Sequence, residues 1–136
     1  MRPLVLACTV WLAAIPALGD ETVVSRSEFR DYATGYTLYF EQDGVPFGSE
    51  TFGEDGAVQW RFRTGECVEG VWASRGAQLC FQYFDGPGEP PQCWRALRDD
   101  DGLMVRLLTS EDAGLELRIS GRDTRPLLCS GPSEET

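Results

Sequence analysis

Cysteines are the residues of this 136-residue chain whose chemistry is easiest to predict. Cys67, Cys80 and Cys93 lie in one aromatic-rich block, and Cys129 lies near the C-terminus. Four cysteines that follow a predicted export signal, here residues 1–19, are typical of two structural disulfides formed in an oxidising compartment. A redox-active pair would need a C-x-x-C spacing or an activated thiol, and the chain has no such spacing. The sequence therefore predicts two disulfide bonds, not thiol catalysis.

Histidine and lysine are both absent from the chain. Without histidine there is no Ser-His-Asp or Cys-His catalysis and no imidazole metal site, and without lysine there is no Schiff-base chemistry. The chain carries 12 basic and 22 acidic residues, a formal net charge of −10. This charge argues against a nucleic-acid partner, because phosphates need basic groups to neutralise them. We predict no cofactor, no metal site and no catalytic residue.

With histidine and lysine absent, the 22 carboxylates are the most numerous acid–base groups of the chain. The run 99–102 places three aspartates before a glycine, but its spacing matches no EF-hand, so we expect a polar hairpin turn. Two carboxylates that face each other across a cleft can hydrolyse a glycosidic bond. A carboxylate-dependent hydrolase is therefore the enzymatic alternative, although no particular pair stands out from the sequence.

Large aromatic side chains could line a ligand pocket. The candidates are Trp60, Trp72, Phe81, Tyr83 and Trp94. A small barrel can hold one small ligand among such rings. The same rings can also fill the interior as core, which we favour because small barrels are commonly filled by their own side chains.

The first 19 residues have the pattern of a secretory signal peptide. Arg2 supplies the positive start, residues 4–14 are an apolar run, and the small residues at 17 and 19 suit a signal peptidase. The run is too short to span a bilayer of about 30 Å as a helix, although an uncleaved anchor is the alternative. Cys8 lies within this segment. We predict a periplasmic or secreted protein with no membrane span after cleavage of residues 1–19.

The rest of the chain is predicted to be a single β domain over residues 20–130, followed by a flexible C-terminal tail at 131–136. Asp-Gly recurs between runs of alternating apolar and polar residues, which is a strong hairpin signal. Its positions are 43–44, 55–56, 85–86 and 101–102. Strands are expected at 36–41, 47–52, 57–63, 67–72, 77–84, 92–98, 103–109 and 115–120. We predict a mainly β fold, an eight-stranded antiparallel meander that forms a small closed or nearly closed barrel, with a flattened β-sandwich as the alternative.

One short N-terminal helix is expected before these strands. Ser27 can cap its start and Gly35 comes just past its end, so we expect a helix over 27–33. Its apolar face holds Phe29, Tyr32 and Ala33. That face is predicted to plug one end of the barrel.

The hairpin that contains Cys67 and Cys80 can be given a register. If residues 73–76 form its turn, Trp72 lies opposite Ala77 on the interior face, and Gly70 leaves room for a neighbouring ring. Both cysteines then fall on the other face.

The pairing of the cysteines follows from that register. Cys67 and Cys80 are diagonal neighbours, and such side chains can come close enough for a disulfide in a twisted hairpin. We favour Cys67–Cys80, which leaves Cys93–Cys129 to pin the C-terminal tail. The two other connectivities stay open.

Four short motifs resemble a family of small exported disulfide-containing proteins from Gram-negative bacteria. They are Gly70-Val71-Trp72, Cys80-Phe81-Gln82-Tyr83, Cys93-Trp94 and Pro126-Leu127-Leu128-Cys129. The resemblance covers most of the chain after the signal and implies export, but it brings no activity and no functional residues. At the level of fold alone, the eight-strand exported design is similar to the barrels of periplasmic lysozyme inhibitors and metalloprotease inhibitors.

These observations favour a non-enzymatic exported binding module. It would bind a protein or a small apolar ligand, through the loops at one barrel end or through its aromatic interior. An inhibitor of a basic, envelope-directed enzyme is one concrete form, because the acidic chain suits a cationic partner. A carboxylate-dependent hydrolase and a structural envelope protein are the alternatives.

Overall fold

The computed structural model describes residues 10–14, 20–85 and 89–130 of the chain. The predicted signal peptide therefore lies largely outside the described residues, and the predicted tail at 131–136 lies wholly outside them. Residues 10–14 form neither helix nor strand. In the part of the chain that is described, no helix combines the length and the apolar character needed to cross a membrane.

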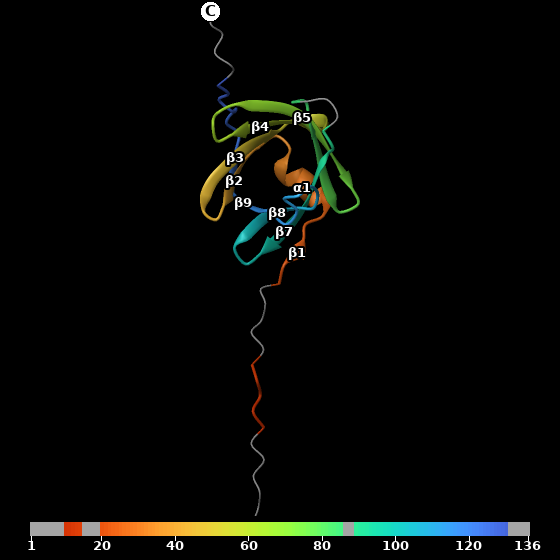
Figure 1. Cartoon of the computed structure of the whole chain (residues 1–136), viewed down its shortest axis with the longest axis vertical. Helices are drawn as coiled ribbons and strands as arrows, with labels where there is room; N and C mark the ends of the chain where they lie inside the picture. Colours follow the sequence, from red (N-terminus) through yellow and green to blue (C-terminus); the bar gives the residue numbers. More distant parts are fainter. Residues whose placement is uncertain (1–9, 15–19, 86–88, 131–136) are drawn as a thin grey trace, which may run out of the picture.

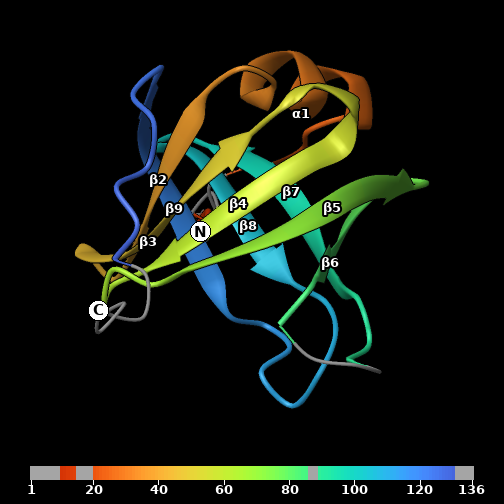
Figure 2. The same ribbon diagram turned by 90° about the horizontal axis from the view of Figure 1, so that it is seen from above.

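Eight antiparallel strands close into a barrel (Figures 1 and 2). They are β2 (Thr37–Gln42), β3 (Val45–Phe52), β4 (Ala57–Phe62), β5 (Cys67–Arg75), β6 (Gln78–Tyr83), β7 (Gln92–Asp99), β8 (Gly102–Leu107) and β9 (Glu116–Asp123). Each strand pairs with the next one in the sequence, and β9 pairs with β2 to complete the ring. The predicted closed meander is confirmed, and the flattened sandwich is not the arrangement. Closure leaves these eight strands without a free edge.

Asp-Gly pairs mark the hairpins because their backbone turns with positive φ. At the β2–β3 turn, Asp43 has φ 50° and Gly44 has φ 80°. Between β3 and β4, Asp55 and Gly56 have φ 59° and 82° within the short 3-10 helix η1 (Glu54–Gly56). Asp-Gly tolerates this left-handed region better than most residue pairs do. The hairpin signal in the sequence therefore places these two turns correctly.

A further strand, β1 (Thr22–Val23), was not predicted from the sequence. It pairs antiparallel with β7, where Thr22 lies opposite Arg98. The next residue, Val24, is 3% exposed and donates its amide to the carbonyl oxygen of Ala96 at 2.9 Å. Two residues are too few to show an alternating pattern, so this segment looks like a polar lead in the sequence.

The helix α1 (Arg26–Ala33) closes one end of the barrel, and in Figure 1 it lies inside the ring of strands. Its cap is Ser25, whose hydroxyl accepts from the Glu28 amide at 3.2 Å, so the predicted cap at Ser27 is wrong by two residues. The predicted buried face is right for Phe29 and Ala33, which are 2% and 0% exposed. The helix therefore plugs the barrel as expected, and it begins one residue earlier.

The register of the β5–β6 hairpin differs from the prediction by four residues. The turn lies at residues 76–77, where Gly76 has φ 58°, and Trp72 lies opposite Phe81 instead of Ala77. Because the difference is an even number of residues, the predicted faces are still correct. Gly70 now lies opposite Tyr83, and it is Tyr83 whose ring occupies the space that glycine leaves.

The disulfides are Cys67–Cys129 and Cys80–Cys93, so the favoured pairing of Cys67 with Cys80 and of Cys93 with Cys129 is wrong. In the observed register Cys80 lies opposite Ala73, far along β5 from Cys67. Cys80 is instead directly opposite Cys93 on β7. Cys67, at the start of β5, holds the segment after β9. The C-terminal segment is pinned as expected, but by the other cysteine.

Gly70 offers a test of this packing. A Cβ at position 70 would lie 2.9 Å from the Tyr83 ring and closer still to the carbonyl oxygen of Gln82. Gly70→Ala is therefore expected to lower the free energy of unfolding by about 2 kcal/mol, measured by urea denaturation. Gly121→Ala is the matched control, because a Cβ there meets nothing within 4 Å. Equal stabilities of the two variants would contradict the close packing of Tyr83 on Gly70.

Candidate ligand-binding site

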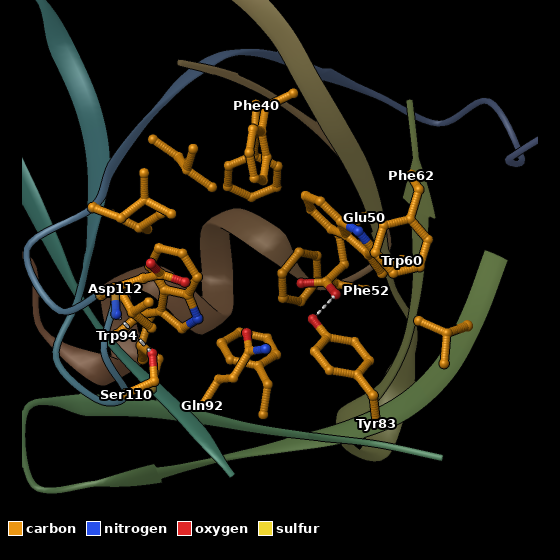
Figure 3. Close-up of a pocket in the computed structure, with 18 of the residues that line it drawn as sticks. Phe40, Glu50, Phe52, Trp60, Phe62, Tyr83, Gln92, Trp94, Ser110 and Asp112 are labelled. Carbon is orange, nitrogen blue, oxygen red and sulfur yellow. Dashed lines mark hydrogen bonds between the residues drawn. The ribbon is translucent and has the colours of Figure 1, made fainter. Parts of the chain in front are cut away.

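A cavity of about 270 Å³ lies inside the barrel, between α1, whose Phe29 lines it, and the opposite end of the barrel. The helix α1 forms the background in Figure 3. For comparison, an apolar protein cavity of about 150 Å³ can hold benzene. The larger volume suits a bicyclic aromatic molecule. Its wall is mainly aromatic, and six of the rings are Phe40, Phe47, Trp60, Phe81, Tyr83 and Trp94.

The mouth of the cavity is formed by residues from strand ends and loops. Phe62 ends β4 and is 42% exposed. Asp85 follows β6, and Ser110 and Asp112 belong to the segment between β8 and β9; all three are exposed and line the cavity. Solvent therefore reaches the interior between these loops, at the end that α1 leaves free.

Glu50 is the buried acid of this cavity. It lies on β3 two residues before Phe52, and both side chains face inward because strand side chains alternate. Glu50 is 3% exposed, and its Oε2 accepts a hydrogen bond of 2.5 Å from the Tyr83 hydroxyl (Figure 3). Among the described residues, the Tyr83 hydroxyl is the one hydrogen-bond partner of the Glu50 carboxyl, and none donates to Oε1.

The pKa values of this pair are set mainly by burial. Loss of water raises the pKa of Glu50 to about 8, and the hydrogen bond from Tyr83 only partly opposes this rise. Burial also raises the pKa of Tyr83 well above its usual value, and the nearby Glu50 charge adds to the effect. At neutral pH Glu50 therefore holds its proton in most molecules, unlike an exposed carboxyl.

Two glycines make room for the rings beside Glu50. A Cβ on Gly48 would overlap the Trp60 ring, and a Cβ on Gly70 would press on Tyr83. Trp60 lies directly opposite Glu50 on β4. The site thus depends on small residues in neighbouring strands, which let two large rings approach the acid from either side.

The structure brings together four of the five aromatic residues that the sequence singled out. Trp60, Phe81, Tyr83 and Trp94 line the cavity. Trp72 does not, because it packs at the other end against α1, with its ring 5.7 Å from that of Phe29. Four of these five rings are thus placed to contact a ligand, and Trp72 belongs to the core beneath them.

Sequence reasoning missed Glu50, which is the most unusual group of the site. The signal was present, because the strand expected at 47–52 places Glu50 on the same face as Phe52. A carboxylate in a partly polar strand is usually taken to face solvent. Asp85 and Asp112 also line the cavity, but they are exposed at its mouth. Within the described ranges, no three histidine, cysteine, aspartate or glutamate side chains gather as a metal site would require.

Comparison with protein families, with curated proteins and with solved structures found no match to this chain. Three features of the cavity bear on function: a size suited to a small molecule, a mainly aromatic wall, and one buried acid with an oxygen free to bind.

Proposed function

We propose that this protein is a non-enzymatic binding module that holds a small, mainly apolar molecule inside its barrel. The observation that carries the proposal is the cavity of about 270 Å³, lined by aromatic rings and opening at one end. Concave, mainly apolar sites with a few polar groups are typical of small-molecule binding. The sequence favours a barrel interior that is filled by its own side chains. The cavity argues against complete filling of that interior.

We extend this proposal to a protein that carries its ligand outside the cytoplasm. Two disulfides are consistent with an oxidising compartment. Periplasmic or secreted location, and kinship with small exported proteins of Gram-negative bacteria, are parts of this proposal. A barrel closed by α1 at one end would take up and release its ligand through the other end.

A carboxylate-dependent hydrolase is the second candidate, and Glu50 is the observation that favours it. A buried carboxyl that keeps its proton at neutral pH resembles a general acid. The mechanism also needs a second carboxylate at the reacting bond. Asp112 is a candidate for it and lies across the cavity from Glu50 in Figure 3. Release of p-nitrophenol from p-nitrophenyl glycosides by the protein, lost in Glu50→Gln, would favour this candidate over simple binding.

Binding can be tested by NMR with indole as a neutral bicyclic probe. Addition of indole is expected to shift the ring N–H resonances of Trp60 and Trp94, which line the cavity. The resonance of Trp72 should move less, because Trp72 does not line the cavity and contacts only the outer side of rings that do. These three of the four tryptophans of the chain therefore act as probe and control within one molecule. Equal shifts at all three, or none at saturating indole, would contradict binding in the cavity.

A matched pair of variants sharpens this test. Val68 lies on the inner face of β5 and lines the cavity, whereas Val71 lies on the outer face of the same strand and is 44% exposed. Val68→Trp is expected to fill the mouth and weaken indole binding about fivefold or more, since a lost ring contact is worth about 1 kcal/mol or more. Val71→Trp should bind indole as the unchanged protein does. Equal affinities of the two variants would place indole outside the barrel.

A further inference from the structure

The acidic character of the cavity wall bears on the kind of ligand it can hold. Among the described residues that line it, Glu50, Asp85 and Asp112 are acidic and none is an arginine. Lysine and histidine are absent from the whole chain. No basic group of the wall is therefore available to neutralise an anionic ligand, which would meet acids both at the mouth and inside.

Glu50 is placed to bind a ligand directly. Its Oε2 is engaged by the Tyr83 hydroxyl, and its carboxyl lines the cavity with Oε1 free of protein partners in the described part of the chain. A buried charge is costly unless it is paired. A ligand that brings a positive charge and an N–H donor would provide the pairing that the protein itself lacks.

The rings near Glu50 add a second reason for a positive charge. Trp60 lies directly across the strand pair from Glu50. Around Trp60 stand the rings of Phe40 at 5.7 Å, Phe47 at 6.0 Å and Phe62 at 6.3 Å, measured between ring centres. The faces of aromatic rings attract cations, and a tryptophan ring does so best. An ammonium group beside Glu50 would contact both a carboxylate and these rings.

We propose that the ligand of this cavity is an organic cation, namely a protonated amine on an aromatic or similarly apolar body. The ammonium would donate to Oε1 of Glu50, and the apolar body would lie among the rings toward Trp94. This inference rests on the proposed function and narrows it to one ligand class. No bond of the ligand is made or broken. The amine stays protonated, and the proton of Glu50 leaves to solvent when the ion pair forms.

This exchange makes binding depend on pH. The titratable groups that face Glu50 are Tyr83 from β6 and, at the mouth of the cavity, Asp85 and Asp112. The residues opposite Glu50 on the neighbouring strands are Leu38 and Trp60, whose side chains do not titrate. Because Glu50 must lose its proton, which it holds up to about pH 8, amine affinity should rise about tenfold per pH unit below that value and then level off. Binding of a neutral analogue should not follow this curve.

Three compounds with the same ring system provide the test: tryptamine, its alcohol analogue tryptophol, and indole-3-acetate. Titration calorimetry of the full-length protein at about pH 8 is expected to show tryptamine binding at least about tenfold tighter than tryptophol, as for a charged hydrogen bond, and no binding of the acetate. Calorimetry in two buffers of different ionisation enthalpy, at about pH 7, should show proton release with tryptamine only.

Glu50→Gln and Glu69→Gln complete the experiment. Glu69 is exposed on the outer face of β5, so its change should leave all affinities unaltered. Glu50→Gln should remove the preference for tryptamine while tryptophol still binds. If tryptophol binds the unchanged protein as tightly as tryptamine, the cation inference is overturned and the binding function stands. If neither compound binds, the proposed binding function fails as well.

Discussion

Replacing Glu50 with glutamine is expected to stabilise the ligand-free protein by about 5 kcal/mol above about pH 8. The reason is the difference between the folded and the unfolded chain. Glu50 has a pKa of about 8 in the folded protein and an ordinary value of 4.5 when exposed. Between these values the folded state keeps a proton that the unfolded state has released.

The sign of the effect follows from this proton. Where the folded state binds more protons than the unfolded state, stability falls as pH rises. The contribution of Glu50 is therefore intact below about pH 4, declines through the interval up to about pH 8, and is constant above it. Glutamine has a similar shape, can still accept from the Tyr83 hydroxyl, and does not titrate. The two proteins should be equally stable in acid and diverge as the solution becomes basic.

Urea denaturation at several pH values measures this difference. Glu69→Gln is the control for the loss of one surface carboxylate, because Glu69 is exposed on the outside of β5. Its stability should track that of the unchanged protein at every pH. A constant difference between Glu50→Gln and the unchanged protein would show that Glu50 titrates like an exposed acid, which would contradict its burial in the barrel.

The titration expected for Glu50 could not be predicted from the sequence. Histidine is the side chain that ordinarily titrates near neutrality, and the chain has none. Burial of one carboxylate supplies such a group, and its environment depends on residues from β3, β4 and β6. Glu50 and Tyr83 are 33 positions apart in the sequence and meet only when the barrel closes. Strand alternation predicts that each faces inward, but not that they touch.

The turn residues and the apolar alternation predicted the strands of the barrel well. They predicted the contacts between those strands less well. The Asp-Gly turn at 43–44 has the positive φ values that its residue types favour, and all eight predicted strands occur in the barrel. The β5–β6 register was wrong because the turn uses residues 76–77 in place of 73–76. A tight turn can be moved by a few residues without disturbing the alternation on which the strand prediction relied.

The disulfide pairing depends on the strand register and on the path of the chain after β9. The alternation of apolar and polar residues specifies neither. Cys67 and Cys80 share a hairpin, and the expected register makes them diagonal neighbours on one face. The observed register separates them, and the path of the chain after β9 brings Cys129 to Cys67. Nothing in the spacing of the cysteines specifies where a C-terminal segment crosses the barrel.

Removal of the Cys67–Cys129 bond is expected to have the second large effect. The double variant Cys67→Ala/Cys129→Ala should lose about 4 kcal/mol of unfolding free energy, since the bond closes a loop with a separation of 62 residues. Cys80→Ala/Cys93→Ala opens a loop with a separation of 13 and should lose about 3 kcal/mol from loop closure. Because Cys80 and Cys93 are 7% and 5% exposed, lost packing adds to the second value.

The two double variants differ more clearly in which segment loses its order than in how much unfolding free energy is lost. After β9 the chain is held to the β4–β5 turn by the Ser130 amide, which donates to the carbonyl oxygen of Gly65 at 2.9 Å. Nearby, Arg61 Nε donates to the carbonyl oxygen of Leu128, also at 2.9 Å. Without the adjacent disulfide, these bonds and the one from the Thr37 hydroxyl to the carbonyl oxygen of Arg125 must offset the entropy of ordering the C-terminal segment. Hydrogen exchange at the Ser130 amide should become fast in the Cys67–Cys129 variant and stay slow in the other.

Thiol titration of the same variants tests the pairing itself. With the observed pairing, each double variant keeps one complete disulfide, so no thiol other than that of Cys8, where it is retained, should react under denaturing conditions. If Cys67 were joined to Cys80 and Cys93 to Cys129, either double variant would break both bonds and leave two reactive cysteines. A gain of reactive thiol would therefore overturn the observed connectivity. Its absence, together with fast exchange at Ser130 only in Cys67→Ala/Cys129→Ala, would establish that this bond anchors the C-terminal segment to the mouth-side turn between β4 and β5.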